Sequence, residues 1–488
     1  MAAAAAAGVR DQVVLLERIE DEGLAQYSYI VGSRDAAEVA VVDPRRDIDA
    51  YLDWCRQRGA RITFVLETHI HADYASGARA LAQRTGATLL VSAHDRGETF
   101  EVAGTHQDMA HGTRISVGGV DLEAVHTPGH TPEHVSFLVF DRLEPAAMLT
   151  GDFLFVGSVG RPDPLGDEES VGLAGRLYDS VQRLQAYPDT LSIFPGHGAG
   201  SMCGSGMGQA PSTTLGQERQ SNPYLDPVLS REAFVQRVLE SAPPPFPPYY
   251  RRMKRVNAAG PPLLEHLPGQ RALDVEDFHR RVKAGQVVID LRDQTAFGAG
   301  HVPGAFGIGA GRMLSMWAAW VVPYDTPLLL IGDDSKIEEA TRALIRVGLD
   351  DVQGSLRGGM PAWTSAGLPV QHTGQITPTE LQQQLATRDQ LQVLDVRTDG
   401  EWRDGHLPEA LHIMGGYLPD RIGDVPRDRP LVVMCGSGYR STIAASVLKR
   451  AGFKHITTLT GGMEAWKDAG LETTREPEFL TTKLPSPR

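Results

Sequence analysis

Short apolar runs, bounded by glycine and proline turns, alternate with helical patterns through the first half of the chain. Runs this short, rich in β-branched residues, favour strands over helices. Histidine or aspartate residues follow closely after four of these runs, which are Ile62–Leu66, Val120–Val125, Ala146–Leu149 and Leu191–Phe194. The pattern predicts sheets with helices between the strands.

A histidine or an aspartate lies just past the end of each of these predicted strands. The four segments are Thr68-His69-Ile70-His71-Ala72-Asp73-Tyr74, His126-Thr127-Pro128-Gly129-His130, Thr150-Gly151-Asp152 and Pro195-Gly196-His197. One such histidine is ordinarily a solvated turn residue, but four segments in this order are not expected by chance. If the strands are neighbours, these groups meet at one edge of the sheets, where imidazole and carboxylate make a metal site.

The second half of the chain contains two similar segments, which predicts a tandem pair of domains. The motifs Asp290-Leu291-Arg292 and His301-Val302-Pro303-Gly304-Ala305 are matched 105 residues later by Asp395-Val396-Arg397 and His406-Leu407-Pro408-Glu409-Ala410. Strand-like and helical patterns alternate in both segments, which favours a parallel α/β sheet. We place the domain boundaries near residues 262 and 372, giving domains of 1–262, 263–372 and 373–488.

The amino-acid composition argues against several classes of protein. Hydrophobic residues make up 41% of the 488 residues, enough for a sizeable core. The net charge of −14 argues against a nucleic-acid partner and against an anionic membrane surface. No apolar run approaches the roughly 18 residues of a membrane span. Three cysteines cannot form a disulfide framework, and the alanine tract at residues 1–8 lacks the features of a secretory signal, so we expect a cytoplasmic protein with reduced thiols.

The order H-x-H-x-D, G-H-T, G-D, G-H resembles the metallo-beta-lactamase superfamily. That resemblance implies an αβ/βα sandwich with the metal in a cleft at its edge. The usual dinuclear version has H-x-H-x-D-H, whereas the last position here is Tyr74. Losing that imidazole removes a ligand of the second metal, which disfavours a two-zinc hydrolase.

A closer resemblance is to the persulfide dioxygenases, which work with one non-haem iron. The matching stretches are Glu67–Asp73, Thr127–Pro132, Thr150–Asp152 and Gly157–Asp163. The resemblance implies one Fe(II) per chain, held by His69, His130 and Asp152. Two histidines and one carboxylate form a facial set that leaves three positions open, enough for O₂ and a substrate sulfur.

The same resemblance implies roles for residues around the iron. His71, Asp73, Tyr74 and His197 become outer-shell groups that orient the ligands. In the alternative dinuclear site, Asp73 and His197 would instead be zinc ligands. Arg161 suits an anionic group of the substrate, because guanidinium pairs well with carboxylate. A purely structural Arg161 stays an alternative.

Cys435 follows an apolar run and opens the sequence Cys435-Gly436-Ser437-Gly438-Tyr439-Arg440-Ser441, ahead of a helical pattern. Small residues let successive backbone N–H groups point inward as an anion nest, and the helix N-terminus adds positive potential. A thiol in that setting is nucleophilic. The loop resembles that of the rhodanese sulfurtransferases. The resemblance implies catalysis by Cys435 and Arg440 and substrate binding by Gly436, Ser437, Gly438 and Tyr439.

The middle domain should carry the same loop, but Gly332 stands opposite Cys435 and is followed by Asp333 and Asp334. It has no thiol, and two carboxylates would repel an anion. We interpret it as a non-catalytic rhodanese-like domain with a role in spacing, packing or oligomer contact. The predicted fold class is α/β: a metallo-beta-lactamase-type sandwich followed by two rhodanese-like domains.

Three further features have both a functional and a structural interpretation. Cys203 lies six residues past His197 on a glycine- and serine-rich loop, so it either faces the cleft as a catalytic sulfur carrier or is an ordinary loop residue. Cys55 lies in an amphipathic helical pattern and is expected to pack. The basic run 251–255 is either a solvated helix face or a phosphate contact for a carrier such as coenzyme A.

These resemblances predict an enzyme that oxidises a low-molecular-weight thiol persulfide (of glutathione, coenzyme A or a similar thiol) with O₂ to sulfite. Sulfur transfer in the third domain would give or use thiosulfate, and the expected purpose is removal of excess sulfide by a homo-oligomer. Two alternatives stay open. One is a dinuclear zinc thioesterase of the glyoxalase II type with an appended sulfurtransferase. The other is a non-enzymatic sulfur carrier or sensor with a vestigial iron site.

Overall fold

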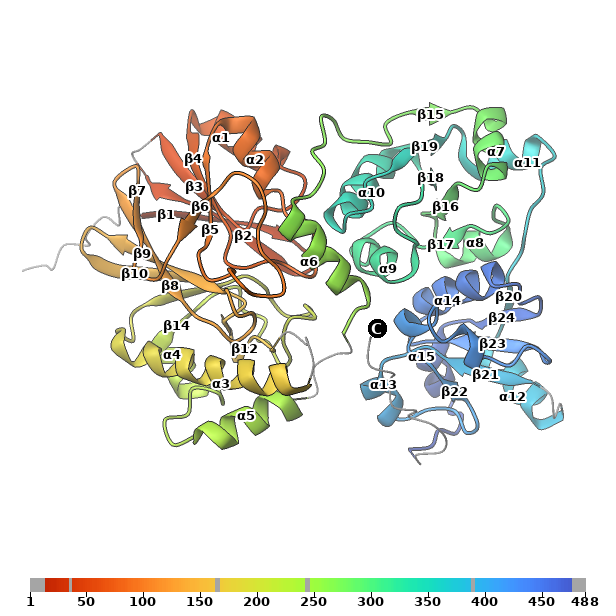
Figure 1. Ribbon diagram of the computed structural model, residues 1–488. Helices are drawn as coiled ribbons and strands as arrows, with labels where there is room; N and C mark the ends of the chain where they lie inside the picture. Colours follow the sequence, from red (N-terminus) through yellow and green to blue (C-terminus); the bar gives the residue numbers. More distant parts are fainter. Residues whose placement is uncertain (1–13, 35–36, 163–166, 242–245, 388–390, 476–488) are drawn as a thin grey trace, which may run out of the picture. The chain divides into compact units, whose positions relative to one another are not determined.

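Two units make up the chain, Met1–Leu263 and Leu264–Arg488 (Figure 1). The computed structural model describes residues 14–34, 37–162, 167–241, 246–387 and 391–475. The alanine tract at residues 1–8 lies outside these ranges, and so does Asp163, the last residue of the matching stretch Gly157–Asp163. In the described residues, no helix combines the length and the apolar character needed to cross a membrane.

The first unit contains two six-stranded sheets. The first sheet has, in spatial order, β1 (Val14–Asp21), β2 (Gln26–Ser33), β3 (Glu38–Val42), β4 (Arg61–Leu66), β5 (Thr88–Ser92) and β6 (Gln107–Met109). The second has β14 (Thr213–Thr214), β13 (Ser192–Pro195), β10 (Glu144–Gly151), β9 (Val135–Asp141), β8 (Val120–His126) and β7 (Arg114–Val117). A small hairpin, β11 (Leu154–Phe155) and β12 (Ser158–Val159), follows β10.

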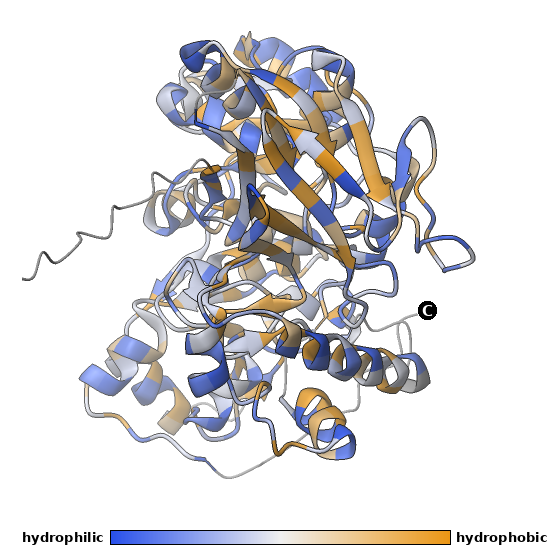
Figure 2. Ribbon diagram, turned by 90° about the vertical axis from the view of Figure 1, so that its left-hand side faces the viewer, coloured by the Kyte–Doolittle hydropathy of each residue, from blue (hydrophilic) through white to orange (hydrophobic). Residues whose placement is uncertain are grey.

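Helices cover the outer face of each sheet. They are α1 (Asp49–Arg58) and α2 (Ala78–Thr85) on the first sheet, and α3 (Asp167–Arg183), α4 (Leu215–Ser221) and α5 (Arg231–Glu240) on the second. A further helix, α6 (Tyr249–Ala259), contacts the segment that follows β4. Helix ribbons in Figure 2 carry both hydrophilic and hydrophobic residues, as expected of helices that bury one face.

Alternation along the strands explains the layers. Tyr29 and Val31 of β2 belong to the core between the two sheets, whereas Ile30 packs in the core that includes Trp54 of α1. On the far side, Met148 of β10 packs with residues of α3 and α5. Because successive strand residues point to opposite faces, each sheet buries both of its faces. The predicted αβ/βα sandwich is confirmed.

The strand ends bring the predicted metal ligands together. The predicted strands coincide with β4, β8, β10 and β13 to within a few residues. β10 pairs with β13 in parallel, so their carboxyl ends lie at the same edge of the second sheet. β3 pairs with β4 in parallel in the first sheet. The segments that follow these strands carry the candidate site.

The second unit contains two five-stranded parallel sheets of the same topology. One has, in spatial order, β15 (Ala272–Leu273), β19 (Val352–Leu356), β18 (Leu328–Ile331), β16 (Val287–Asp290) and β17 (Phe306–Gly307). The other has β20 (Gly374–Ile376), β24 (Ile456–Leu459), β23 (Leu431–Met434), β21 (Gln392–Asp395) and β22 (Leu411–His412). The repeat seen in the sequence is therefore a repeat of whole domains.

Nine helices lie between the strands of the second unit in its described residues. They are α7 (Val275–Lys283), α8 (Gln294–Ala299), α9 (Leu314–Val321), α10 (Asp334–Arg346), α11 (Gly359–Ser365), α12 (Pro378–Thr387), α13 (Asp399–Arg403), α14 (Tyr439–Arg450) and α15 (Gly462–Asp468). Cys435 follows the central strand β23, and Gly332 follows its counterpart β18. Cys435 and Gly332 therefore occupy equivalent positions, each directly after the central strand of its sheet.

Candidate metal centre and sulfur-transfer loop

His69, His130 and Asp152 converge in the first unit, and all three are buried. Their donor atoms lie within 4.8 Å of one another. Asp152 Oδ2 is 3.9 Å from His69 Nε2 and 3.5 Å from His130 Nε2. The three side chains predicted as iron ligands are therefore brought together.

Hydrogen bonds set which nitrogen of each histidine is free. Thr68 Oγ1 donates to Asp43 Oδ2 at 2.8 Å, so it must accept from His69 Nδ1, 2.9 Å away. His130 Nδ1 donates to the carbonyl oxygen of Arg161 at 2.7 Å, since a carbonyl can only accept. In the neutral form of each ring, Nε2 is therefore the nitrogen without a proton, and it is directed toward Asp152.

The arrangement fits a bound cation. His69 Nε2 and Asp152 Oδ2 are buried and have no hydrogen-bond partner among the described residues. Buried polar atoms are rarely left in that state. Two imidazole nitrogens and one carboxylate oxygen are the donor set of a non-haem ferrous centre, so the residues present fit the iron implied by the resemblance.

His197 bridges two carboxylates. Its Nδ1 lies 2.7 Å from Asp152 Oδ1 and its Nε2 lies 2.7 Å from Asp73 Oδ2. Burial lowers the pKa of His197, but the two carboxylates outweigh it and raise that pKa well above its ordinary value. Both ring nitrogens are thus engaged in hydrogen bonds, and the ring orients Asp152.

His71 is directed to a different carboxylate. Its Nε2 lies 3.2 Å from Asp43 Oδ1, and Asp43 outweighs the effect of burial to raise the pKa of His71 to about 9. The Tyr74 hydroxyl donates to the Asp43 carbonyl oxygen at 3.2 Å. His71 and Tyr74, the second and last positions of the H-x-H-x-D-H motif, therefore both contact Asp43.

Cys203 lies beside the centre. Its thiol is buried and falls within 4.8 Å of donor atoms of Asp73 and His197. Burial, with the Asp152 and Asp73 carboxylates, raises the pKa of this thiol well above its ordinary value. The Cys203 thiol thus lies beside Asp73 and His197, while Cys55 packs in the core beneath α1.

Arg161 is buried near the same centre. Its backbone N–H donates to the Cys203 carbonyl at 3.1 Å, and its guanidinium lies 4.4 Å from the centroid of the Phe246 ring. The basic run 251–255 falls in α6. Because Lys254 is buried and Arg255 is exposed, the run is not a uniformly solvated helix face.

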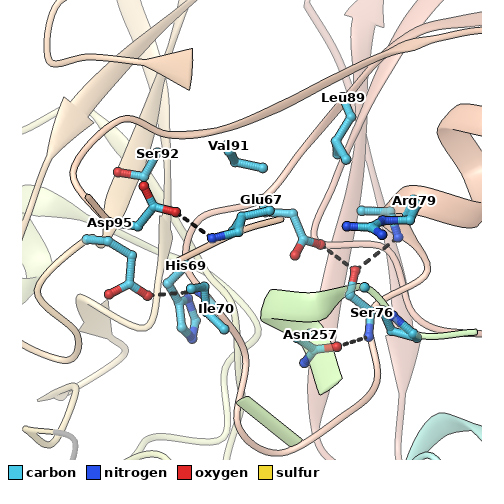
Figure 3. A pocket seen from close by; sticks show the side chains of 15 residues that line it. Glu67, His69, Ile70, Ser76, Arg79, Leu89, Val91, Ser92, Asp95 and Asn257 are labelled. Atoms are coloured by element: carbon cyan, nitrogen blue, oxygen red, sulfur yellow. Dashed lines mark hydrogen bonds between the residues drawn. The ribbon is translucent and has the colours of Figure 1, made fainter. Parts of the chain in front are cut away.

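A pocket opens on the first-sheet side of the centre (Figure 3). It is lined by His69 but by neither of the other two predicted ligands. Ser76 donates to Glu67 at 2.6 Å and its backbone N–H donates to Asn257 at 2.9 Å. Arg161 and Cys203 do not line it, so the pocket is separate from the predicted substrate contacts.

Three supporting residues were not predicted from the sequence. Asp43 holds Thr68 and His71, as described above. His134 Nε2 accepts from the Asp152 backbone N–H at 3.0 Å, and burial lowers the pKa of this ring, which keeps it neutral. Asn257 donates to the carbonyl oxygens of His71 and Tyr74 at 2.8 Å. Asp43 directly follows β3, so the strand-end pattern itself could have found it.

The sulfur-transfer loop of the second unit curls around Cys435. The Gly438 N–H donates to Cys435 Sγ at 3.1 Å, and Ser441 Oγ lies 3.7 Å from the same sulfur. Gly438 has φ +113°, a conformation that favours glycine. Gly462 packs against the loop, because a Cβ there would lie 2.3 Å from the Cys435 carbonyl oxygen.

Two side chains of the loop have partners outside it. Arg440 pairs with both carboxylate oxygens of Glu401 at 2.6 Å. The Tyr439 hydroxyl donates to the Gly309 carbonyl of the middle domain at 3.1 Å. Any role of Arg440 in catalysis, or of Tyr439 in substrate binding, must therefore be compatible with these two contacts.

Comparison with known proteins agrees with both halves of this description. The sequence model of the Metallo-beta-lactamase superfamily matches residues 21–197, and that of the Rhodanese-like domain matches residues 274–366 and 377–469. The boundaries predicted near 262 and 372 fall outside the matched ranges. Persulfide dioxygenase ETHE1, mitochondrial, from Bos taurus is 30% identical over 227 residues, 46% of this chain and 80% of its own length. The chain belongs to the metallo-beta-lactamase superfamily.

This superfamily member is also similar to other proteins. A hydroxyacylglutathione hydrolase from Rhodospirillum rubrum is 30% identical over 35% of the chain. The crystal structure of a metallo-beta-lactamase from Staphylococcus aureus is 32% identical, with a TM-score of 0.62, covering 70% of this chain and 98% of that one. The chain spans 58% to 61% of the length of three of the curated relatives it matches. It is a fusion of a metallo-beta-lactamase domain with two rhodanese-like domains.

Proposed function

We propose that the first unit is a persulfide dioxygenase with one ferrous iron and that Cys435 is the nucleophile of a sulfurtransferase. One observation carries the first part: the donor atoms of His69, His130 and Asp152 lie within 4.8 Å of one another, and His69 Nε2 and Asp152 Oδ2 have no hydrogen-bond partner among the described residues. His71 and His197, in contrast, are turned to carboxylates. The similarity to a persulfide dioxygenase supports the same assignment.

The proposed reaction is RSSH + O₂ + H₂O → RSH + sulfite + 2H⁺. The bound iron supplies the redox chemistry that lets O₂ react with the terminal sulfur. The protein orients the donors: Thr68 and the Arg161 carbonyl fix the two imidazoles, and His197 fixes the carboxylate. Arg161 is proposed to attract the anionic part of a glutathione or coenzyme A persulfide.

The second unit is proposed to move sulfane sulfur. The Cys435 thiolate attacks the terminal sulfur of a persulfide, RSH leaves, and Cys435 becomes a persulfide. Sulfite then takes that sulfur as thiosulfate, and the thiolate returns. The Gly438 N–H donates to the sulfur that carries the charge. Coupled to the first unit, this chemistry would remove excess sulfide.

Cys203 is proposed as a sulfur carrier beside the iron, because its thiol lies next to Asp73 and His197. The cytoplasmic location and the homo-oligomer stay predictions.

Metal analysis and oxygen uptake test the assignment together. The dioxygenase predicts one iron per chain and O₂ consumption with glutathione or coenzyme A persulfide. A protein that holds two zinc ions, consumes no O₂ with either persulfide when loaded with iron, and hydrolyses thioesters would overturn it in favour of the glyoxalase II type of enzyme. Thiosulfate:cyanide sulfur transfer tests the second unit separately.

A further inference from the structure

The middle domain, which has Gly332 in place of a catalytic thiol, packs against the helix that follows the sulfur-transfer loop. This helix, α14, contacts both β17 and α8 of the middle domain within the second unit. Its first residue is Tyr439, so its N-terminus is also the end of the loop that curls around Cys435. Any shift of α14 would therefore move the donors around the sulfur.

The N-terminal end of α14 is held by residues just past β17. The Tyr439 hydroxyl donates to the Gly309 carbonyl at 3.1 Å, and the Tyr439 ring lies against Gly309, where a Cβ would be in van der Waals contact with ring Cε2 at 3.5 Å. Next to it, a Cβ on Gly438 would lie 3.9 Å from Gln294 Nε2 of α8. Gly438 is the residue whose N–H points at Cys435 Sγ.

The C-terminal end of α14 is held by residues around the start of β17 and by His372, at the end of the middle domain. The Arg450 guanidinium donates to the Gly304 carbonyl and lies 4.5 Å from the centroid of the Phe306 ring. Lys449 Nζ donates to the His372 carbonyl. A single strand of the middle domain thus lies between the two fixed ends of the helix.

A second contact fixes the turn Gly415–Tyr417, which also packs on α14. Trp320 of α9 lies edge-on to Tyr417, with ring centroids 5.3 Å apart. A Cβ on Gly416 would lie 2.1 Å from the Trp320 ring, so the middle domain and the turn approach as closely as glycine allows.

We infer that the middle domain is a positioning part of the sulfur-transfer site: by holding α14 at Tyr439 and at Arg450, it keeps the Gly438 N–H aimed at the sulfur of Cys435. This inference rests on the sulfur-transfer role proposed for Cys435. It gives the middle domain, which lacks the catalytic thiol, a role in the reaction. Gly309 and Gly304 contribute their backbone carbonyl groups.

Tyr439→Phe in the full-length chain tests the inference. It removes one hydrogen bond to the middle domain and leaves the ring in place. Two rates are measured: alkylation of Cys435 by iodoacetamide in a Cys55→Ala/Cys203→Ser background, and thiosulfate:cyanide sulfur transfer. We expect both to fall by about twofold to tenfold, the effect of one net hydrogen bond. Tyr324→Phe is the matched control, because the Tyr324 hydroxyl donates to the Val347 carbonyl at 3.0 Å inside the middle domain.

Arg450→Gln is a second variant, at the other end of α14 and at an exposed position, in case Tyr439→Phe does not fold. It should slow alkylation in the same direction while the thermal unfolding midpoint stays near the parent's. Equal rates in Tyr439→Phe and the parent, or equal losses in Tyr439→Phe and Tyr324→Phe, would overturn the inference. If the parent transfers no sulfur, the proposed function fails, and the alkylation rates still decide whether the middle domain positions the loop.

Discussion

Replacing Thr68 by valine should weaken iron binding without changing any ligand. Valine keeps the shape of this fully buried side chain and removes the hydroxyl. His69 Nδ1 then loses its acceptor and Asp43 Oδ2 loses a donor. Each buried group left unpaired costs about 1–3 kcal/mol, so we expect the first unit to lose about 2 kcal/mol of stability or more.

The effect on the metal follows from the same two contacts. The hydroxyl fixes the tautomer and the orientation of the His69 ring, and losing such a support typically lowers metal affinity by about 10- to 100-fold. That range corresponds to about 1.4–2.8 kcal/mol of binding free energy. The backbone bond from the Thr68 N–H to Asp43 Oδ1 at 2.7 Å survives the change, so the ligand loop should keep its place.

Anaerobic titration of the apoprotein with ferrous iron, against a coloured chelator, measures the affinity, and urea unfolding measures the stability. Thr341→Val is the control, because Thr341 is equally buried and donates to the Ile337 carbonyl at 2.9 Å in the other unit. It should leave iron affinity unchanged. A folded Thr68→Val protein that binds iron as tightly as the parent would refute the reasoning.

Four more outcomes are expected. Asp152→Ala should lose iron and oxygen uptake yet keep thiosulfate:cyanide transfer; loss of both activities in a folded protein would contradict separate sites. Cys435→Ser should abolish sulfur transfer and let sulfite accumulate in place of thiosulfate, unless another thiol does the work, in which case transfer would continue near the parent's rate. Cys203→Ser should change the ratio of sulfite to thiosulfate at unchanged iron content, and identical products would make Cys203 a packing residue. Burial raises the pKa of Glu401, but its hydrogen bonds, above all those from Arg440, lower it to about 2 from 4.5. A depressed carboxyl pKa stabilises the fold above about pH 4.5, and this stabilisation is lost as the pH falls toward 2. The difference in unfolding midpoint between the parent and Glu401→Gln should therefore be present at neutral pH and shrink toward pH 2. A difference that stays constant with pH would count against the ion pair.

Strand ends explain why so much of the metal centre was predictable. A short apolar run fixes where a strand stops, and parallel neighbours such as β10 and β13 deliver Asp152 and His197 to one edge. Asp43 follows β3 in the same way and was missed because a single aspartate beside a proline is typical of a turn. Its φ of +51° and its bonds to Thr68 and His71 are set by tertiary packing.

His134 and Asn257 could not be found from spacing. His134 precedes its strand, and its role depends on the backbone N–H of Asp152, which comes from another strand. Asn257 reaches the histidine loop from α6, across more than 180 residues of sequence. The partner of Tyr439 was equally hidden, since a backbone carbonyl at Gly309 leaves no residue-type signal.

The double engagement of His197 has a consequence for metal loading in a cell. Zinc generally binds nitrogen and oxygen donors more tightly than ferrous iron does. The affinity of His69, His130 and Asp152 therefore cannot by itself exclude zinc. A second zinc would have to pull His197 away from Asp73 and Asp152, both 2.7 Å from its ring nitrogens. If iron is the native metal, as proposed, we therefore expect zinc loading of the metal-free protein to give fewer than two ions per chain, although Asp73, His197 and Cys203 lie close enough together to hold one. A ratio of two zinc ions per chain in that titration would show that the two hydrogen bonds of His197 do not keep a second ion out.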